Sequence, residues 1–197
     1  DEAIRKGLVS SVGGFDAKAA EDAQKFAVEN SRMKIPLITG LDVVHGYYTI
    51  FPIPLASACS WNMPLLEESA RVAADEASAF GINWTFAPMV DICRDPRWGR
   101  IAEGAGEDPC LGSRIGRAMV RGFQGDDLSK PNTLLACVKH FALYGASEAG
   151  RDYNTVSMDP VTMYNYYLPP YKAAFDEGAG SGMTSFNVVN GVPATGN

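Results

Sequence analysis

The stretch Leu134-Leu135-Ala136-Cys137-Val138-Lys139-His140-Phe141 is an apolar run that ends in a cation and an imidazole. Residues 134–138 carry no polar side chain, which predicts a strand buried on both faces, as in a parallel sheet. Two interpretations of its end are open: Lys139 and His140 lie where the chain meets water, or they line a pocket. Apolar and aromatic neighbours follow at once, and sites in α/β proteins lie at carboxyl ends of strands. We therefore favour the pocket.

Further strands are predicted on both sides of this one, separated by helices. The strands span residues 8–10, with Gly13-Gly14 after them, and residues 35–42, 83–91 and 182–187. The helices run from an Asp16 cap to about Asn30, from a cap at Asn62 or Met63 to Gly81, over 113–123, and from Asp159-Pro160, with an interruption at Pro169-Pro170, to Gly178. The polar loop over 92–112 is too long to be a simple connection.

The predicted strand ends recur at nearly even spacing. Asp91 follows Asp42 by 49 residues, His140 follows Asp91 by 49, and Phe186 comes 46 residues later. This is the rhythm of βα units that carry their chemistry at strand ends, as (β/α)8 TIM barrels do. The sequence therefore predicts an α/β fold, with about the first five strands of a TIM-barrel-like domain over residues 1–197. We expect this domain to be truncated at its C-terminal end, with about three βα units missing.

The composition is that of one globular domain. The chain has 197 residues, of which 46% are hydrophobic, enough for one substantial core. Its net charge of −6, without a basic cluster, argues against nucleic acid or an anionic membrane as a partner. No apolar run approaches the roughly 20 residues of a membrane span, and residues 1–4 are not a signal peptide, so we expect a mature or trimmed chain. The four cysteines lack C-x-x-C spacing, which favours buried thiols over a zinc site or disulfides.

Asp42-Val43-Val44-His45-Gly46 places a carboxylate and an imidazole at one strand end. This pair could be half of a metal site or a carboxylate that binds hydroxyls, with His45 a loop or core residue. A chain with two histidines cannot assemble a histidine-rich centre. We therefore predict no metal and no cofactor.

The loop Arg94-Asp95-Pro96-Arg97-Trp98-Gly99-Arg100 gathers three arginines around a tryptophan. Neighbouring acids balance their charge, which favours internal ion pairs with one arginine reserved for a ligand. The adjacent carboxylates Glu107 and Asp108 are expected to have a structural role, because side chains next to each other in sequence rarely point at the same atom.

A neutral, polyhydroxylated ligand suits these side chains. Hydroxyl-binding candidates are Asp42, Arg94, Lys139, His140 and Arg151, and the aromatic residues able to pack against a sugar face are Phe86, Trp98 and Phe186. The same groups could instead hold a carboxylated metabolite. Consecutive strand side chains alternate, so for Lys139 and His140 to reach one ligand the backbone must deviate. We expect a non-proline cis peptide at this point.

Several motifs together resemble the N-terminal domain of glycoside hydrolase family 3, of the β-glucosidase type. They are residues 42–46, Ala87 to Arg100, Glu107-Asp108-Pro109, Lys139-His140-Phe141 and Met183-Thr184-Ser185-Phe186-Asn187. The match runs from Leu8 to Asn197. The resemblance implies hydrolysis of terminal β-D-glucosyl residues by a retaining double displacement, with a β-glucoside or oligosaccharide as substrate.

The resemblance also implies roles for individual residues. Asp42 accepts hydrogen bonds from hydroxyls of the non-reducing glucose, Arg94, Lys139 and His140 hold other hydroxyls, and Arg151 matches a further sugar-binding arginine. Met183 and Phe186 belong to the fifth-strand motif that borders the sugar. The nucleophile is an aspartate on the next strand, expected beyond Asn197, and the acid/base is a glutamate of a following α/β domain. We therefore expect no catalytic residue in this chain.

Three departures and alternatives bear on the subtype. Phe186 stands where the family often has tyrosine, so a hydroxyl near the nucleophile is missing. Residues 146–154 contain no histidine, which disfavours the N-acetylglucosaminidase branch, and Asp42 in place of glutamate is more like glucosidases than xylosidases. A non-catalytic carbohydrate-binding or interaction fragment derived from such an enzyme is the alternative. The resemblance favours a periplasmic or secreted location and leaves the oligomeric state open.

Overall fold

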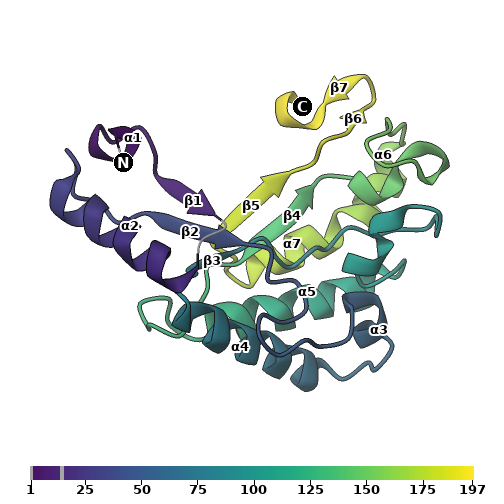
Figure 1. Cartoon of the computed structure of the whole chain (residues 1–197). Helices are drawn as coiled ribbons and strands as arrows, with labels where there is room; N and C mark the ends of the chain where they lie inside the picture. Colours follow the sequence, from purple (N-terminus) through teal and green to yellow (C-terminus); the bar gives the residue numbers. More distant parts are fainter. Residues whose placement is uncertain (1, 14–15) are drawn as a thin grey trace.

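Helices and strands alternate along the chain in the computed structural model, which describes residues 2–13 and 16–197 (Figure 1). The strands are β1 (Ser11–Gly13), β2 (Ile38–Leu41), β3 (Trp84–Thr85), β4 (Cys137–Phe141), β5 (Ser181–Thr184), β6 (Val188–Val189) and β7 (Val192–Pro193). The α-helices are α1 (Glu2–Arg5), α2 (Ala17–Asn30), α3 (Pro54–Ala58), α4 (Met63–Ala79), α5 (Pro109–Gln124), α6 (Pro160–Thr162) and α7 (Pro169–Asp176). Short 3₁₀ turns are η1 (Gly99–Glu103), η2 (Tyr144–Ala146), η3 (Glu148–Gly150) and η5 (Ala194–Gly196), and η4 (Met163–Tyr167) is a π-helical turn.

The first five strands are parallel and follow one another in space in chain order. β1 pairs with β2 and β2 with β3, while β4 pairs with β5. Parallel bridges join Trp84 of β3 to Leu135, just before β4, and Met89, after β3, to Lys139 of β4. All five carboxyl ends therefore point to one edge, and only β6 and β7 form an antiparallel hairpin.

Three of the four predicted helices begin where the sequence predicts them because their capping side chains are in place. Asp16 accepts a hydrogen bond from the Ala19 amide, Asn62 from the Leu65 amide, and Asp159 from the Thr162 amide. The fourth predicted helix is interrupted before Pro169, as expected, since a proline cannot donate a backbone hydrogen bond within a helix.

The core lies between the strands and the helices α4, α5 and α7. Ala70, Ala73 and Ala77 of α4, with Val120 and Phe123 of α5, pack against the apolar run 134–138. Leu134, Ala136, Cys137 and Val138 are fully buried, which confirms the prediction from their uninterrupted apolar sequence. Small side chains on α4 allow close packing, and at Gly122 of α5 a Cβ atom would collide with the Glu67 carbonyl of α4.

Two predicted strands and one predicted helix differ in position. The first strand does not span residues 8–10. The Leu8 amide instead donates to the Ala3 carbonyl and closes α1, the Leu8 residue is 75% exposed, and strand pairing begins at Ser11. The third strand is only two residues long. Pro88 has no N–H to donate to a strand ladder, and the segment 86–90 pairs with β4 only through the isolated bridge at Met89. The helix expected at 113 begins at Pro109, after an Asp108 cap. Asp1, Gly14 and Phe15 lie outside the described residues, and so does part of the predicted Gly13-Gly14 turn.

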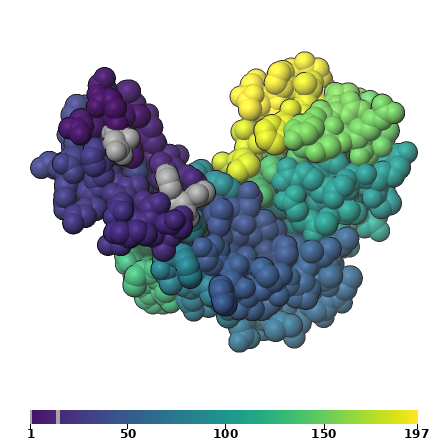
Figure 2. Space-filling model, viewed as in Figure 1, coloured from purple at the N-terminus to yellow at the C-terminus, as the bar shows by residue number. Residues whose placement is uncertain are grey.

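The two ends of the strand series stand apart. Figure 1 shows β1, with α2 beside it, diverging from β5, and Figure 2 shows the molecule hollowed between the N-terminal segment in purple and the C-terminal segment in yellow. Within residues 2–13 and 16–197, no helix is both long and apolar enough to cross a bilayer.

Candidate functional site

The carboxyl end of β4 carries the centre of the site. The Lys139 side chain is only 2% exposed, and its Nζ lies 2.8 Å from Asp42 Oδ1 at the end of β2 and 3.6 Å from Glu103 Oε2 in η1. A buried ammonium needs such counter-charges. The strand ends predicted to meet, those of Asp42 and Lys139, therefore do meet.

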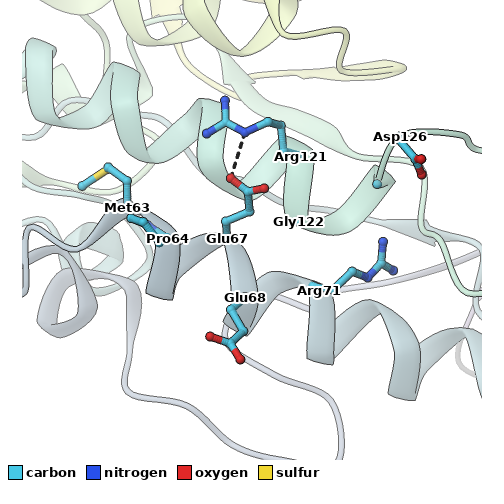
Figure 3. A pocket seen from close by; sticks show the side chains of 9 residues that line it. Met63, Pro64, Glu67, Glu68, Arg71, Arg121, Gly122 and Asp126 are labelled. Atoms are coloured by element: carbon cyan, nitrogen blue, oxygen red, sulfur yellow. Dashed lines mark hydrogen bonds and ion pairs between the residues drawn. The ribbon is translucent and has the colours of Figure 1, made fainter.

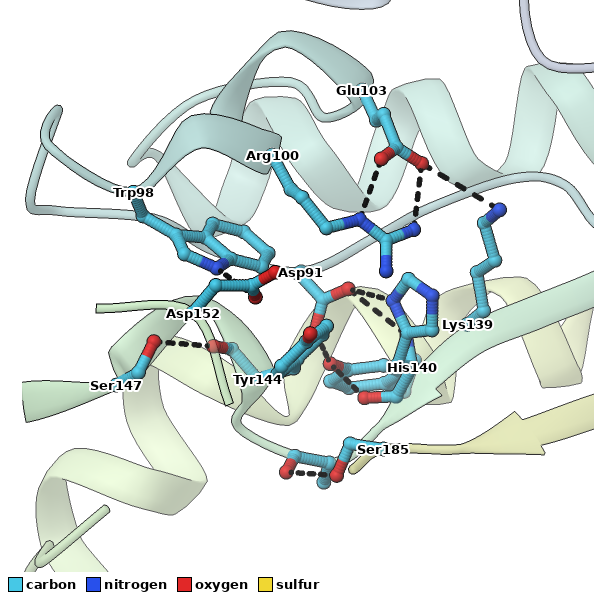
Figure 4. A network of polar contacts seen from close by, with 12 residues as sticks. Asp91, Trp98, Arg100, Glu103, Lys139, His140, Tyr144, Ser147, Asp152 and Ser185 are labelled. Carbon is cyan, nitrogen blue, oxygen red and sulfur yellow. Dashed lines mark hydrogen bonds and ion pairs between the residues drawn. The ribbon is translucent and has the colours of Figure 1, made fainter. Parts of the chain in front are cut away.

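Glu103 also holds an arginine. Arg100 Nε lies 2.6 Å from Glu103 Oε1, and Arg100 Nη2 lies 2.9 Å from Oε2, a two-pronged pair within η1. Burial alone would raise the pKa of Glu103, but the hydrogen bond from Arg100 and the charge of Lys139 outweigh it and hold that pKa below its usual value. Glu103 is therefore an anion shared by two cations (Figure 4).

His140 is tied to a buried carboxylate. The backbone N–H and the ring Nδ1 of His140 both lie 2.9 Å from Asp91 Oδ2. Tyr171 of α7 donates its hydroxyl to Asp91 Oδ1 at 2.5 Å and approaches the His140 carbonyl at 2.9 Å. Burial, followed by the charge of Asp91, raises the pKa of Tyr171 far above its usual value, so it remains a donor.

Aromatic side chains support the imidazole from another side. The Tyr144 ring lies edge-to-face with His140 at 5.1 Å and with Trp98 at 5.1 Å, and the Arg100 guanidinium lies over Tyr144. Trp98 in turn donates Nε1–H to Asp152 at 3.0 Å. Trp98 is fully buried, so the expectation that its ring packs against a sugar is wrong in this structure.

The peptide bond between Lys139 and His140 is cis, as expected, and so is the bond between Phe141 and Ala142. Both side chains are buried at the end of β4, one toward Asp42 and the other toward Asp91. Both residues are thus withdrawn from bulk water, while their place in a ligand pocket stays a prediction.

The remaining predicted site residues lie at varying distances from this cluster. Met183 of β5 is half-buried beside Lys139 in the strand register, and Phe186 is 63% exposed with its ring 5.9 Å from that of Tyr144. Arg94 is exposed, and its guanidinium lies over Tyr166. Arg151 is exposed as well, with no hydrogen bond or ion pair from its side chain to the rest of residues 2–13 and 16–197. The structure does not bring Arg94 or Arg151 to the cluster.

Sequence reasoning missed Arg100 and Glu103 as site residues. They are three positions apart on one turn, and such a spacing brings an acid and a base together. The same loop confirms the predicted internal ion pairs: Arg97 Nη2 lies 2.6 Å from Asp95 Oδ2, and hydrogen bonds from Arg97 lower the pKa of Asp95 to about 2. Asp108 caps α5, which confirms its structural role.

A hollow of about 420 Å³ opens beside the cluster. It is lined by Asp42, Val44, His45, Gly46, Ile50, Ile53, Pro54, Arg100, Ala102 and Glu103. Its lining combines charged donors and acceptors with apolar side chains, the mixture that small-molecule sites use. Across the described part of the chain, no three His, Cys, Asp or Glu side chains are grouped so as to hold a metal ion.

A larger hollow of about 680 Å³ lies elsewhere, between α4 and α5 (Figure 3). It is crossed by the ion pair of Arg121 with Glu67, whose Nε and Oε2 atoms are 2.8 Å apart. None of the predicted site residues lines it, so we place the chemistry at the strand ends.

Two of the four cysteines, Cys93 and Cys137, are buried free thiols, as predicted, and burial raises the pKa of each. Cys59 and Cys110 are exposed. Their thiols take no part in the cluster.

Comparison with known proteins gives consistent matches. Residues 8–197 match the family model described as glycosyl hydrolase family 3 N terminal domain. The chain is 45% identical over 197 residues to a periplasmic β-glucosidase of Salmonella typhimurium, covering 98% of this chain and 26% of that protein. It is 35% identical over 208 residues to a β-xylosidase of Formosa agariphila, covering 98% and 29%.

Among solved structures, a mutant β-glucosidase of Listeria innocua in complex with laminaribiose has a TM-score of 0.91 at 50% identity, covering 94% of this chain and 26% of that one. The α/β fold is therefore similar to the corresponding part of that enzyme. The chain spans about a quarter of the length of these relatives.

Proposed function

The chain belongs to glycosyl hydrolase family 3, and from that premise we propose that it supplies the innermost sugar-binding subsite of an enzyme that hydrolyses terminal β-D-glucosyl residues from oligosaccharides or glycosides. The relatives named as β-glucosidases and β-xylosidases support glycoside hydrolysis in general. The glucosyl specificity rests on the identities of 45% and 50% to the β-glucosidases of Salmonella typhimurium and Listeria innocua and on Asp42 in the second-strand motif.

The observation that carries the proposal is the cluster of Asp42, Lys139, Glu103 and Arg100 beside His140, at the edge of a hollow. It presents two cations and two carboxylates at fixed separations. Sugar hydroxyls both donate and accept, so a ligand with several hydroxyls matches alternating donors and acceptors. The two cations and the two carboxylates balance, so the cluster gives a simple anion no net attraction.

Within this proposal the residues have separate tasks. Asp42, which is 63% exposed, accepts from hydroxyls, Lys139 and His140 hold neighbouring hydroxyls, and Met183 with Phe186 borders the ring. We assign the guanidinium contact to Arg100 in place of Arg94, because Arg100 lies with Glu103 and Lys139. Arg151 is left as an outer contact.

The reaction is proposed to be a retaining double displacement, with attack by a carboxylate, a covalent glycosyl-enzyme and hydrolysis by water. We place the nucleophile and the acid/base outside these 197 residues. In support, the carboxylates near the cluster are already engaged: Asp42 with Lys139, Glu103 with Arg100, and Asp91 with Tyr171 and His140. Partners that keep a carboxylate ionised make it a poor proton donor.

The proposal extends to the architecture. Five parallel strands in order, each delivering side chains at one edge, are what the first part of a (β/α)8 TIM barrel requires. We propose that residues 1–197 are the truncated N-terminal barrel domain, that the remaining strands and a following α/β domain are its partners, and that neither nucleic acid nor a membrane is. A periplasmic or secreted location agrees with that of the Salmonella typhimurium relative, which is named as a periplasmic enzyme.

The test uses the full-length protein that contains this chain, with nitrophenyl β-D-glucoside and nitrophenyl β-D-xyloside compared at equal concentrations. We expect a higher kcat/KM for the glucoside and, by NMR of the first-formed product, retention of the β-anomer. A preference for the xyloside would overturn the glucosyl assignment. Binding of glucose without turnover of either substrate would instead support the carbohydrate-binding alternative.

A further inference from the structure

The Asp91–His140 contact fixes where the imidazole carries its hydrogen. Asp91 Oδ2 lies 2.9 Å from the backbone N–H of His140, and a backbone N–H is always a donor. That oxygen therefore acts as an acceptor. His140 Nδ1 faces the same oxygen, also at 2.9 Å, so Nδ1 must be the donor in this contact.

The other atoms around Asp91 leave this assignment unchanged. The Tyr171 hydroxyl donates to Asp91 Oδ1 at 2.5 Å and also lies 2.9 Å from the His140 carbonyl. Neither of these contacts involves Oδ2. The side chain of Asp91 is fully buried, so water does not compete for Oδ2.

The ring cannot turn to exchange its nitrogens. One edge is hydrogen-bonded to Asp91, and the Tyr144 ring packs edge-to-face against it. Tyr144 is itself held against the buried Trp98. Figure 4 shows the second ring nitrogen, Nε2, on the side of the ring away from Asp91.

The surroundings of Nε2 favour a role as hydrogen-bond acceptor for this nitrogen. Within residues 2–13 and 16–197 no hydrogen bond to Nε2 is recorded, and Nε2 is not among the buried atoms that lack a partner. The cations of the cluster, Arg100 and Lys139, are donors only. A ligand hydroxyl that accepts from one of them must place its own hydrogen elsewhere, and Nε2 is the acceptor that Asp91 leaves free.

We propose that Asp91 is a positioning residue that holds His140 with its hydrogen on Nδ1, so that Nε2 accepts a hydrogen bond from one sugar hydroxyl. The identity of the ligand in this inference rests on the proposed function. The placement of the hydrogen on Nδ1 does not depend on that function. The site then requires a hydroxyl that donates a hydrogen bond at this position. It discriminates against a group of the same size that cannot donate one.

The substrate side is tested by competitive inhibition of the full-length enzyme by glucose and by its monodeoxy and monodeoxyfluoro analogues. Fluorine has nearly the size of a hydroxyl oxygen but cannot donate. Besides the hydroxyls that donate to Asp42, we expect one further position at which the deoxy and the deoxyfluoro sugars are both weaker inhibitors than glucose by the same factor, about 5- to 10-fold for one lost hydrogen bond, and it is identified as the position whose donor dependence Asp91→Leu removes. A fluoro analogue that inhibits as well as glucose at every position would overturn the proposal.

Variants separate positioning from a merely structural role. In Asp91→Asn the amide oxygen can still accept a hydrogen bond from His140. The deoxy and deoxyfluoro sugars should therefore still inhibit this variant more weakly than glucose by the same factor. In Asp91→Leu the acceptor is gone, and that position should lose its dependence on a donor. Tyr171→Phe, the matched control, removes the contacts to Asp91 Oδ1 and to the His140 carbonyl but leaves Asp91 Oδ2 in place, and it should lower the melting temperature without changing the inhibition pattern.

Neutron diffraction from a crystal of the full-length protein in heavy water locates the hydrogen directly. This measurement requires neither that the Asp91→Leu variant folds nor that a sugar binds. We expect deuterium on His140 Nδ1 and none on Nε2. Deuterium on Nε2 would refute the inference. If no sugar inhibits, the glucosidase proposal fails, and the neutron map alone decides the placement of the hydrogen.

Discussion

Replacing Asp42 by alanine in the full-length enzyme should reduce catalysis far more than stability. The carboxylate is 63% exposed, so its ion pair with Lys139 is screened and should contribute less than about 1 kcal/mol to folding. A hydrogen bond from a sugar hydroxyl to a charged group contributes about 1.5 to 3 kcal/mol, which is about 10- to 150-fold in rate. Lys139 would also lose its nearer counter-charge and keep only Glu103, at 3.6 Å.

We therefore expect kcat/KM on an aryl β-glucoside to fall on the order of 100-fold or more, with kcat falling as well, because these bonds strengthen as the ring distorts. Asp42→Asn keeps an acceptor without the charge and should lose about 10-fold. Asp126→Ala is the matched control, since Asp126 pairs with Lys130 at 2.6 Å on the surface. Wild-type kinetics in Asp42→Ala, or an equal loss in the control, would refute the reasoning.

Three further outcomes are expected. Arg100 holds the pKa of Glu103 below its usual 4.5. The extra unfolding free energy of the wild type over Glu103→Gln should therefore be complete above about pH 4.5 and decline as the pH falls through the lowered pKa. Melting curves in which this difference does not depend on pH would contradict the expectation. Asp108→Ala should cost about 1 kcal/mol of unfolding free energy with kcat/KM unchanged, because Asp108 caps α5 and lies outside the cluster; unaltered melting would argue against the cap. Gly122→Ala would gain about 1 kcal/mol from helix propensity, yet we expect a lower melting temperature, since its Cβ meets the Glu67 carbonyl, and a higher one would show that α4 and α5 can separate.

The order of βα units could be predicted because the signals for it are local. Asp16, Asn62 and Asp159 cap helices through bonds to amides three residues away, and the run 134–138 is apolar whichever strand lies beside it. Errors arose where a neighbour decided the outcome. Leu8 reads as a strand residue, but its amide closes α1.

The strand ends could be proposed as a site for a similar reason. Parallel strands deliver their last side chains to one edge, so Asp42 and Lys139, far apart in sequence, come near each other once the sheet forms. The residue types at that edge suit hydroxyl binding, and the family motifs are the basis for proposing a sugar.

What the sequence alone determined is thus the parallel α/β plan and the polar edge. Only the tertiary structure decided which side chains lie together there. Arg94 and Arg100 are equivalent in sequence terms, but the η1 turn directs Arg100 to Glu103 while Arg94 lies over Tyr166. Likewise, no local pattern pairs Asp91 with His140. Their contact depends on strands and helices packing across the whole domain, and the free energy of such packing is not contained in any short stretch of sequence.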